Sequence, residues 1–420
     1  MLLQKSTLNN GIRVVTERMP GLHSVTVGFW VQNGSRHEDE PLSGISHFIE
    51  HMLFKGTASR SALQIAKEID SVGGVLNAFT GREFSCYYAK VLGNKLPQAI
   101  ALLSDLVLNS TFCEQEIEKE RRVILQEISM VQDTPDDQVH DLFCESIWHS
   151  HPLGRPVLGR AESVGRITQA DLLEMLERRY FGHNILIVAA GDLHHQEIVA
   201  QIEQVFAAVP AGVQDNLCTL PDYRPGVQVS AKNLEQTHFC LGCKALPQNH
   251  EDRFTLHLLN SILGGSMSSR LFQEIREQRG LAYSIYSYLN THSDAGSLVV
   301  YAGTRPDDLR ETLKLILEQF GQLKNGMIGS EELQMAKEQM KGTLLLSLES
   351  SDNRMTRLAK NEIFLGYQPR IREIVAAIDK VSIESLQRVA KLLLNDDSLN
   401  LHVVGPTNRH QLPLSMLSIP

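Results

Sequence analysis

Cysteine and long apolar runs are both scarce in this sequence. The chain has 420 residues but only 6 cysteines, too few for a disulfide framework, so we expect a reducing compartment. Its longest apolar runs, such as residues 185–190, fall far short of the ~20 residues that a membrane span requires. The first residues show neither a secretory signal nor an amphipathic presequence. These absences predict a cytoplasmic protein of bacterial type that contacts no membrane.

Basic residues do not dominate either. There are 40 Lys and Arg against 49 Asp and Glu, which gives a formal net charge of -9. This balance disfavours binding to nucleic acid or anionic lipid and mildly favours cationic peptides. The hydrophobic share of 42% and the charged share of 21% are typical of a globular chain. A chain of this length is expected to form two or three domains.

The second half of the sequence resembles the first at an offset of about 213 residues. In each half an apolar strand leads through a polar turn into a helix. A β-rich stretch and two amphipathic helices follow in the same order. The strands at residues 25–31 and 238–243 correspond, as do the helices through His47 and Asn260. The sequence is therefore interpreted as a duplication.

A stretch rich in proline and glycine, residues 210–227, separates the two halves and has the composition of a linker. We therefore predict an α+β fold with two homologous domains, each a mixed, mostly antiparallel sheet covered by helices. The predicted limits are residues 1–212 and 228–420, joined by a linker at residues 213–227.

The sharpest chemical signal is the pattern His47-Phe-Ile-Glu50-His51. On a helix these three polar residues share one face, so the imidazoles can hold an ion while the carboxylate reaches a water beside it. Two histidines and a carboxylate suit Zn²⁺ and leave a fourth position open. Such a short pattern also arises by chance, so a third ligand is needed. Glu120 and Glu127 lie seven residues apart on one helix face, where one can ligate and the other support.

Together these residues resemble the inverted-zincin metallopeptidases of the pitrilysin type, family M16, and most closely their mitochondrial-processing-peptidase-like branch. The resemblance extends from residue 8 to about residue 394. It implies that His47, His51 and Glu127 bind one Zn²⁺ per chain. It also implies that Glu50 is the general base and that Glu120 orients a ligand from outside the metal's own shell.

Two further features of the resemblance concern the substrate. Arg276 and Tyr283 resemble a pair that the second domain contributes across the cleft, which implies that Tyr283 stabilises the oxyanion and that Arg276 anchors a substrate carbonyl or positions Tyr283. Without the resemblance, Arg276 is interpreted as a surface arginine. Asn77, Ala78 and Phe79 resemble the strand whose edge receives the substrate backbone, although any sheet edge has this appearance.

The second half of the sequence has no metal ligands at the positions that correspond to those of the first. Those positions hold Asn260, Leu263, Gly264, Ala336 and Thr343. By the resemblance, the two domains form a clamshell around a chamber that admits unfolded substrates. The sequence thus predicts a zinc-dependent endopeptidase acting on unfolded peptides or precursor segments, as a homodimer or paired with a related chain. The alternative is a non-catalytic partner or scaffold subunit of a processing-peptidase-like complex.

Overall fold

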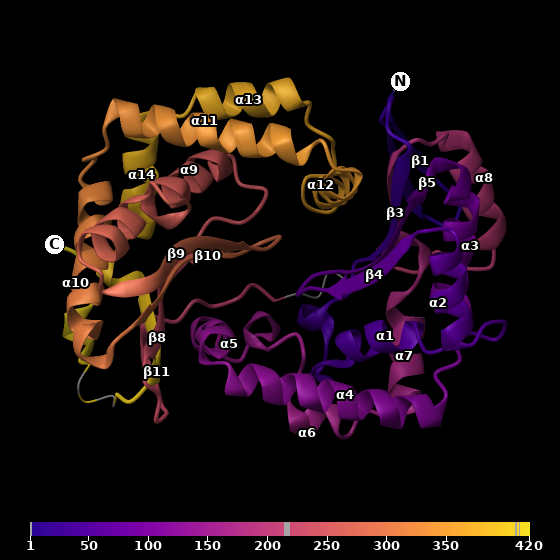
Figure 1. Ribbon diagram of the computed structural model, residues 1–420, viewed down its shortest axis with the longest axis horizontal. Coiled ribbons are helices and arrows are strands. Elements are labelled where there is room, and N and C mark those ends of the chain that lie inside the picture. Colours follow the sequence, from indigo (N-terminus) through magenta and orange to yellow (C-terminus); the bar gives the residue numbers. More distant parts are fainter. Residues whose placement is uncertain (1, 214–218, 408–409, 411) are drawn as a thin grey trace. The chain divides into compact units, whose positions relative to one another are not determined.

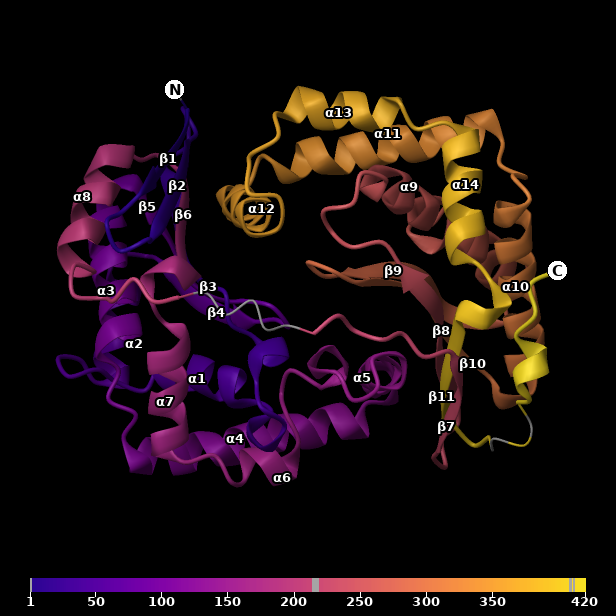
Figure 2. The same ribbon diagram turned by 180° about the vertical axis from the view of Figure 1, so that it is seen from behind.

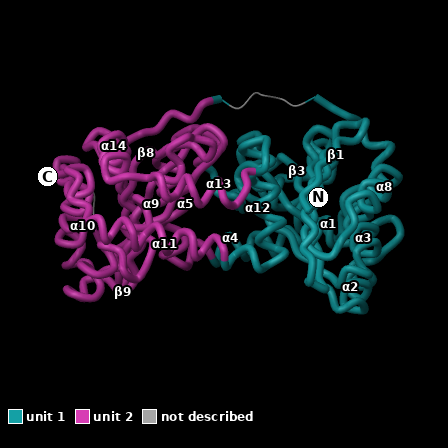
Figure 3. The backbone as a smooth tube through the Cα atoms, turned by 90° about the horizontal axis from the view of Figure 1, so that it is seen from above, with its two compact units in different colours: residues 1–130, 155–219, 346–368 teal, residues 131–154, 220–345, 369–420 magenta. Residues whose placement is uncertain are grey.

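The computed structural model describes residues 2–213, 219–407, 410 and 412–420. Its chain forms two compact units, each built on its own β-sheet with helices around it (Figures 1 and 2). Neither unit is continuous in sequence, because each takes one segment from the opposite half of the chain (Figure 3). Unit 1 comprises residues 1–130, 155–219 and 346–368, and unit 2 comprises residues 131–154, 220–345 and 369–420.

Unit 1 contains a mixed sheet with the strand order β1-β2-β6-β3-β5-β4. Neighbouring strands are antiparallel except β2 and β6, which are parallel. Among the described residues, β4 pairs only with β5, so its other edge has no strand partner there. The strands are β1 (Leu3–Thr7), β2 (Arg13–Arg18), β3 (Ser24–Val31), β4 (Val75–Thr80), β5 (Ser85–Leu92) and β6 (Ile185–Gly191).

Unit 2 repeats this arrangement with the strand order β7-β11-β8-β10-β9. Here β7 and β11 are parallel, as β2 and β6 are in unit 1, and the other neighbours are antiparallel. The five strands therefore match β2, β6, β3, β5 and β4 in turn. This match confirms the predicted duplication and the α+β class. The strands are β7 (Gly226–Ala231), β8 (Thr237–Ala245), β9 (Ala282–Thr291), β10 (Gly296–Thr304) and β11 (Leu399–Gly405).

Amphipathic helices cover one face of each sheet. In α3, Ile100, Leu103 and Val107 recur at helical spacing and are buried against the sheet. In unit 1 the helices are α1 (Ile45–Leu53), α2 (Ala62–Ser71), α3 (Leu96–Asn109), most of α4 (Glu114–Asp133), α6 (Ala161–Val164), α7 (Gln169–Arg179) and α8 (His195–Val205). In unit 2 they are α9 (Arg253–Gly264), α10 (Leu309–Lys324), most of α11 (Ser330–Ser347), α13 (Ile371–Asp379) and α14 (Ile383–Leu393).

The opposite face of each sheet is covered by a helix from the other half of the chain. The strand β6 is apolar at every position, and because successive side chains point to opposite faces, it needs apolar partners on both. The helix α12 (Ser351–Phe364) provides the second layer in unit 1, where Met355 and Leu358 pack on Trp30 and Val188. In unit 2, α5 (Pro135–Ile147) covers the matching face through Val139 and Phe143.

The predicted linker, residues 213–227, lies partly outside the described residues, because residues 214–218 are not described. Its last residues belong to β7, which begins at Gly226. The predicted domain limits name contiguous halves, whereas the compact units exchange residues 131–154 and 346–368. Among the described residues, every helix is too short or too polar to span a lipid bilayer. The clamshell concerns the placement of one unit against the other and stays a prediction.

Replacement of Leu358 by alanine tests the exchanged helix. Leu358 is fully buried in the second core of unit 1, so Leu358→Ala should lower the free energy of unfolding of this unit by about 2–5 kcal/mol. The chain has two tryptophans, and Trp30 contacts α12 through Met355. Denaturant titration followed by Trp30 fluorescence in a Trp148→Phe background therefore reports on unit 1.

The matched control is Leu346→Ala, because the side chain of Leu346 is 76% exposed. This substitution should change the free energy of unfolding by less than about 0.5 kcal/mol. An equally small change for Leu358→Ala would contradict the packing of α12 on this sheet.

Candidate metal centre

The helix α1 presents the histidine pattern on the face turned away from the core. Phe48, Ile49 and Met52 are buried against the sheet of unit 1, and the helical period therefore places His47, Glu50 and His51 on the opposite side. All three of these polar residues are partly exposed. The predicted shared face is thus present in the structure.

A buried carboxylate fixes the start of α1. Glu38 accepts hydrogen bonds from the backbone N–H of Gly44 at 2.7 Å and of Ser46 at 2.8 Å, which satisfies two donors that a helix start leaves open. Burial raises the pKa of Glu38, while these bonds and the nearby Arg155 oppose the rise. The side-chain amide of Asn33 donates to the hydroxyl of Ser46 at 3.1 Å. The loop before α1 thereby holds the helix in place.

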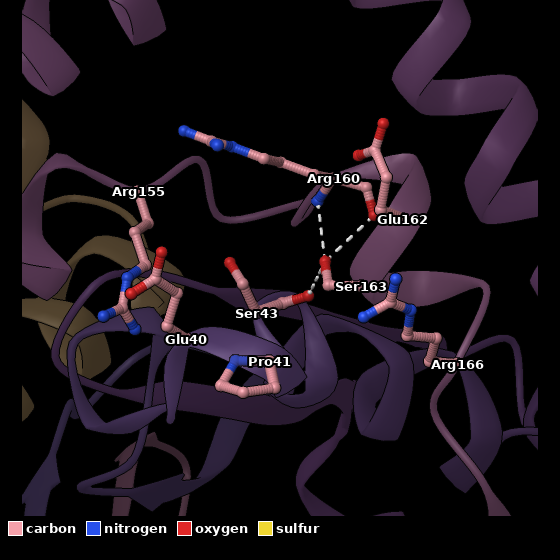
Figure 4. Close-up of a pocket in the computed structure, with 8 residues that line it drawn as sticks. All are labelled: Glu40, Pro41, Ser43, Arg155, Arg160, Glu162, Ser163 and Arg166. Carbon is pink, nitrogen blue, oxygen red and sulfur yellow. Dashed lines mark hydrogen bonds between the residues drawn. The ribbon is translucent and has the colours of Figure 1, made fainter.

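A hollow of about 280 Å³ lies beside this helix start and is lined by three arginines, two glutamates and two serines (Figure 4). The hydroxyl of Ser163 donates to the carbonyl oxygen of Ser43 at 2.7 Å and accepts from the backbone N–H of Arg160 at 3.1 Å. Arg155 donates to the carbonyl oxygen of Glu38 at 2.8 Å. We interpret the side chains around the hollow as structural, because their hydrogen bonds hold the loop that precedes α1.

The structure brings Glu127 of α4 to the two histidines of α1. Its Oε2 lies 3.8 Å from Nε2 of His47 and 3.6 Å from Nε2 of His51, and the three ligand atoms all lie within 4.8 Å of one another. Two imidazole nitrogens and one carboxylate oxygen are a donor set for Zn²⁺ with a position left open. Among the described residues this is the only group of three or more His, Cys, Asp or Glu with such proximity.

His47 is neutral at pH 7 and ready to act as a ligand. Burial lowers its pKa to about 4, and the neighbouring His51 contributes to the same shift. Its Nδ1 is buried and has no hydrogen-bond partner among the described residues. The polar contacts of the ring are therefore made at Nε2, on the side of Glu127.

Glu120 fixes the orientation of His51. Its Oε2 lies 3.0 Å from Nδ1 of His51, and its Oε1 lies 2.7 Å from Nζ of Lys55. Because a carboxylate only accepts hydrogen bonds, Nδ1 is the donor to Glu120, and Nε2 is the ring atom that faces Glu127. The two glutamates of α4 therefore differ in place: Glu127 lies at the ligand atoms, and Glu120 lies behind one ligand. Lys55 was not predicted, since it follows the end of the helix and has no motif spacing.

Glu50 lies near His51 and Glu127, and one of its carboxylate oxygens accepts a hydrogen bond. The hydroxyl of Thr80 on β4 donates to its Oε2. Burial raises the pKa of Glu50 and the charge of Glu127 adds to the rise, whereas the bond from Thr80 and the charge of His51 oppose it. Thr80 directly follows Phe79 in β4, but nothing in the sequence spacing indicated a contact with Glu50.

The remaining predicted residues lie on two edge strands and a neighbouring π-helix. Asn77, Ala78 and Phe79 belong to β4 and therefore to the free edge of the sheet in unit 1. Arg276 and Tyr283 belong to unit 2, on the π-helix Phe272–Gln278 and on β9. The Arg276 guanidinium lies 4.8 Å from the centre of the Tyr283 ring, and Tyr283 is 82% exposed. The structure thus pairs these two residues within unit 2.

Comparison with protein-family models gives two adjacent matches. Residues 13–161 match the model described as insulinase, peptidase family M16. Residues 166–340 match the model described as the peptidase M16 inactive domain. The two matches together span most of the chain, and the candidate metal ligands lie in the first.

Among relatives, an uncharacterized zinc protease of Bacillus subtilis is 41% identical over 396 residues, which cover 94% of this chain and 97% of the relative. Among solved structures, a protease from Helicobacter pylori aligns with a TM-score of 0.89 at 23% identity, over 96% of this chain and 99% of that one. A chain of complex III2 from Candida albicans aligns with a TM-score of 0.85 at 20% identity, over 99% of both chains. These two structures share the fold.

Glu120→Gln tests whether the bond to Nδ1 prepares His51 for the metal. The substitution removes the charge that fixes the imidazole and leaves Lys55 unpaired, so zinc affinity should fall about tenfold to a hundredfold. The affinity is measured by competition with a chromogenic chelator at fixed pH.

Glu116→Gln is the matched control on the same helix, since Glu116 bonds Lys119, a residue exposed to solvent. Its zinc affinity should equal that of the wild type. Wild-type affinity in Glu120→Gln would contradict the orienting role of Glu120.

Proposed function

Because the chain belongs to peptidase family M16, we propose that it is a zinc-dependent endopeptidase that hydrolyses unfolded peptides or precursor segments. The observation that carries this proposal is the convergence of His47, His51 and Glu127 at one point, with Glu50 beside them. These four residues supply a metal-binding set and a proton acceptor in one place, which is what metal-assisted hydrolysis of a peptide bond requires.

His47, His51 and Glu127 would hold one Zn²⁺ per chain. When bound, the ion lowers the pKa of a coordinated water to about 7 and polarises a carbonyl oxygen. Glu50 takes the proton of the attacking water on its carboxylate and delivers it to the departing amine nitrogen, so that the carboxylate is regenerated after each cycle. Glu120 keeps the imidazole of His51 in the tautomer that a ligand needs.

Tyr283 and Arg276 complete the proposed site from the second homologous domain, as the family resemblance implies. The Tyr283 hydroxyl donates a hydrogen bond to the carbonyl oxygen as negative charge develops on it. Arg276 packs against the tyrosine ring and either positions it or anchors a substrate carbonyl. The high exposure of Tyr283 supports this role, because its hydroxyl stays accessible to a ligand.

The free edge of β4 supports the proposed mode of substrate binding. An extended peptide can pair with Asn77, Ala78 and Phe79 through main-chain hydrogen bonds, which select an unfolded conformation more than a sequence. In a folded substrate most strands are already paired within their own sheet, so an unfolded segment pairs with this edge more readily. We further propose that the protein acts in the cytoplasm, as a homodimer or paired with a related chain.

The second candidate function is that of a non-catalytic partner or scaffold subunit. The likeness to a chain of complex III2 supports it, because the same fold occurs there within a complex. The complete ligand set and the adjacent Glu50 favour the enzyme, since a purely structural subunit has no use for three converging ligand atoms.

Glu50→Gln separates metal binding from catalysis. The variant keeps all three ligands, so it should retain about one equivalent of zinc, yet peptide cleavage should fall at least about a hundredfold because the proton acceptor is lost. Zinc is quantified by elemental analysis, and cleavage by mass spectrometry on an unbiased peptide pool.

The control is Glu162→Gln, which removes an exposed carboxylate in the same unit and should leave both quantities unchanged. Cleavage by Glu50→Gln at the wild-type rate would refute the mechanism. A wild-type chain that holds zinc but cleaves nothing would favour the partner subunit.

Tyr283→Phe tests the contribution of unit 2. Loss of one oxyanion donor should lower kcat at least about tenfold, with zinc content unchanged because Tyr283 is no ligand. Steady-state kinetics on one peptide from the pool gives the value. Tyr367→Phe serves as control, since Tyr367 is also an exposed tyrosine, and an unchanged kcat in Tyr283→Phe would exclude the proposed role.

A further inference from the structure

The hydrogen bond between Thr80 and Glu50 joins two separate elements of unit 1. Thr80 is the last residue of β4, and Glu50 lies within α1. Since a carboxylate can only accept, the threonine hydroxyl is the donor and Oε2 of Glu50 the acceptor. The other carboxylate oxygen, Oε1, forms no hydrogen bond with the described residues. The two oxygens of Glu50 are thus unequal.

The Thr80 hydroxyl is itself held by a neighbouring strand. Thr80 stands opposite Ser85 in the antiparallel pair of β4 and β5. The fully buried Ser85 hydroxyl lies 3.0 Å from the carbonyl oxygen of Asn33 and 3.3 Å from Oγ1 of Thr80, and its single proton faces these two acceptors. Thr80 donates its own proton to Glu50, and the neighbouring Ser85 hydroxyl lies against the same oxygen of Thr80.

The turn between β4 and β5 is docked on the loop that leads to α1. The backbone N–H of Ser35 donates to the carbonyl oxygen of Gly81 at 3.2 Å. A Cβ at Gly34 would lie only 2.3 Å from that same oxygen, so the approach depends on glycine. The side chains of Arg36 and Glu83 form an ion pair at 2.8 Å that is almost fully buried.

The same loop also fixes the start of α1, through Glu38 and Asn33. Thr80 and Glu50 therefore share one support, although they lie thirty residues apart in sequence. A contact supported in this way is set by the fold and does not depend on the chance rotamer of a surface side chain.

We propose that Thr80 is a positioning residue for Glu50, in an inference that rests on the proposed function. Its hydroxyl holds Oε2, so that Oε1 is the oxygen that receives the proton of the water. If the carboxylate rotated, neither oxygen would face the attacking water. Even a small displacement of a reacting group lowers the reaction rate strongly. Because the bond uses the side chain of Thr80 alone, the backbone of β4 stays available to the substrate.

The test compares Thr80→Val with Thr80→Ser. Valine keeps the branched shape without a donor, so kcat should fall about tenfold to a hundredfold, as expected for loss of a hydrogen bond to a charged group. KM and zinc content should stay at the wild-type values, because neither the strand edge nor the ligands change. Serine restores the hydroxyl and should restore most of kcat.

Ser85→Ala is a second variant, useful if Thr80→Val does not fold. It removes the hydroxyl that lies against Oγ1 of Thr80 and should lower kcat about threefold to tenfold. The matched control is Ser104→Ala, because the Ser104 hydroxyl is also buried in unit 1 but has no partner among the described residues. This control should leave kcat unchanged.

The outcomes separate this inference from the proposed function. If Glu50→Gln cleaves like the wild type, the role of Glu50 in the proposed function is refuted, and the inference falls with it. If Glu50→Gln is inactive but Thr80→Val keeps the wild-type kcat, the positioning role is wrong and the function stands. A rise in KM or a loss of zinc in Thr80→Val would overturn the inference in favour of a role at the substrate edge or in metal binding.

Discussion

The bond between Glu120 and His51 joins the two helices that carry the candidate metal ligands. A buried carboxylate is costly unless it is paired, and Glu120 is paired on both oxygens, with His51 and with Lys55. Glu38 plays the corresponding part at the other end of α1, where its two oxygens accept backbone N–H groups. The helix is thus held between two buried carboxylates. Because the bond from Glu120 also ties α1 to α4, it helps to set the distances between the ligand atoms of His47, His51 and Glu127.

The duplication and the order of the elements were predictable because they rest on local signals. Apolar alternation predicts strands and helical spacing predicts helices, and both recur in the two halves of the sequence. The exchange of helices was not predictable from such signals. Met355 and Leu358 indicate that α12 has an apolar side, but the sequence does not say which sheet it covers. The parallel pairing of β2 with β6 likewise joins segments far apart in the chain.

For the site, sequence spacing was informative within one helix and less so between helices. It placed His47, Glu50 and His51 on one face of α1 but left open which glutamate of α4 ligates. The structure distinguishes the two, because Glu127 lies at Nε2 of His51 and Glu120 at its Nδ1. The contact of Thr80 with Glu50 could not be predicted from the spacing of the two residues in the sequence. A hydroxyl that bonds across two elements is visible only once the fold brings those elements together.

The position of α12 late in the sequence delays the completion of unit 1 during synthesis. The sheet of unit 1 has all its strands once β6 ends at Gly191, but the helix that covers its second apolar face ends at Phe364. At about 5–20 residues per second, this face waits roughly ten to thirty seconds for its cover. During that interval Trp30 and Val188, fully buried in the finished protein, are open to water on the ribosome. Until α12 is made, the second core of unit 1 lacks one of its two layers.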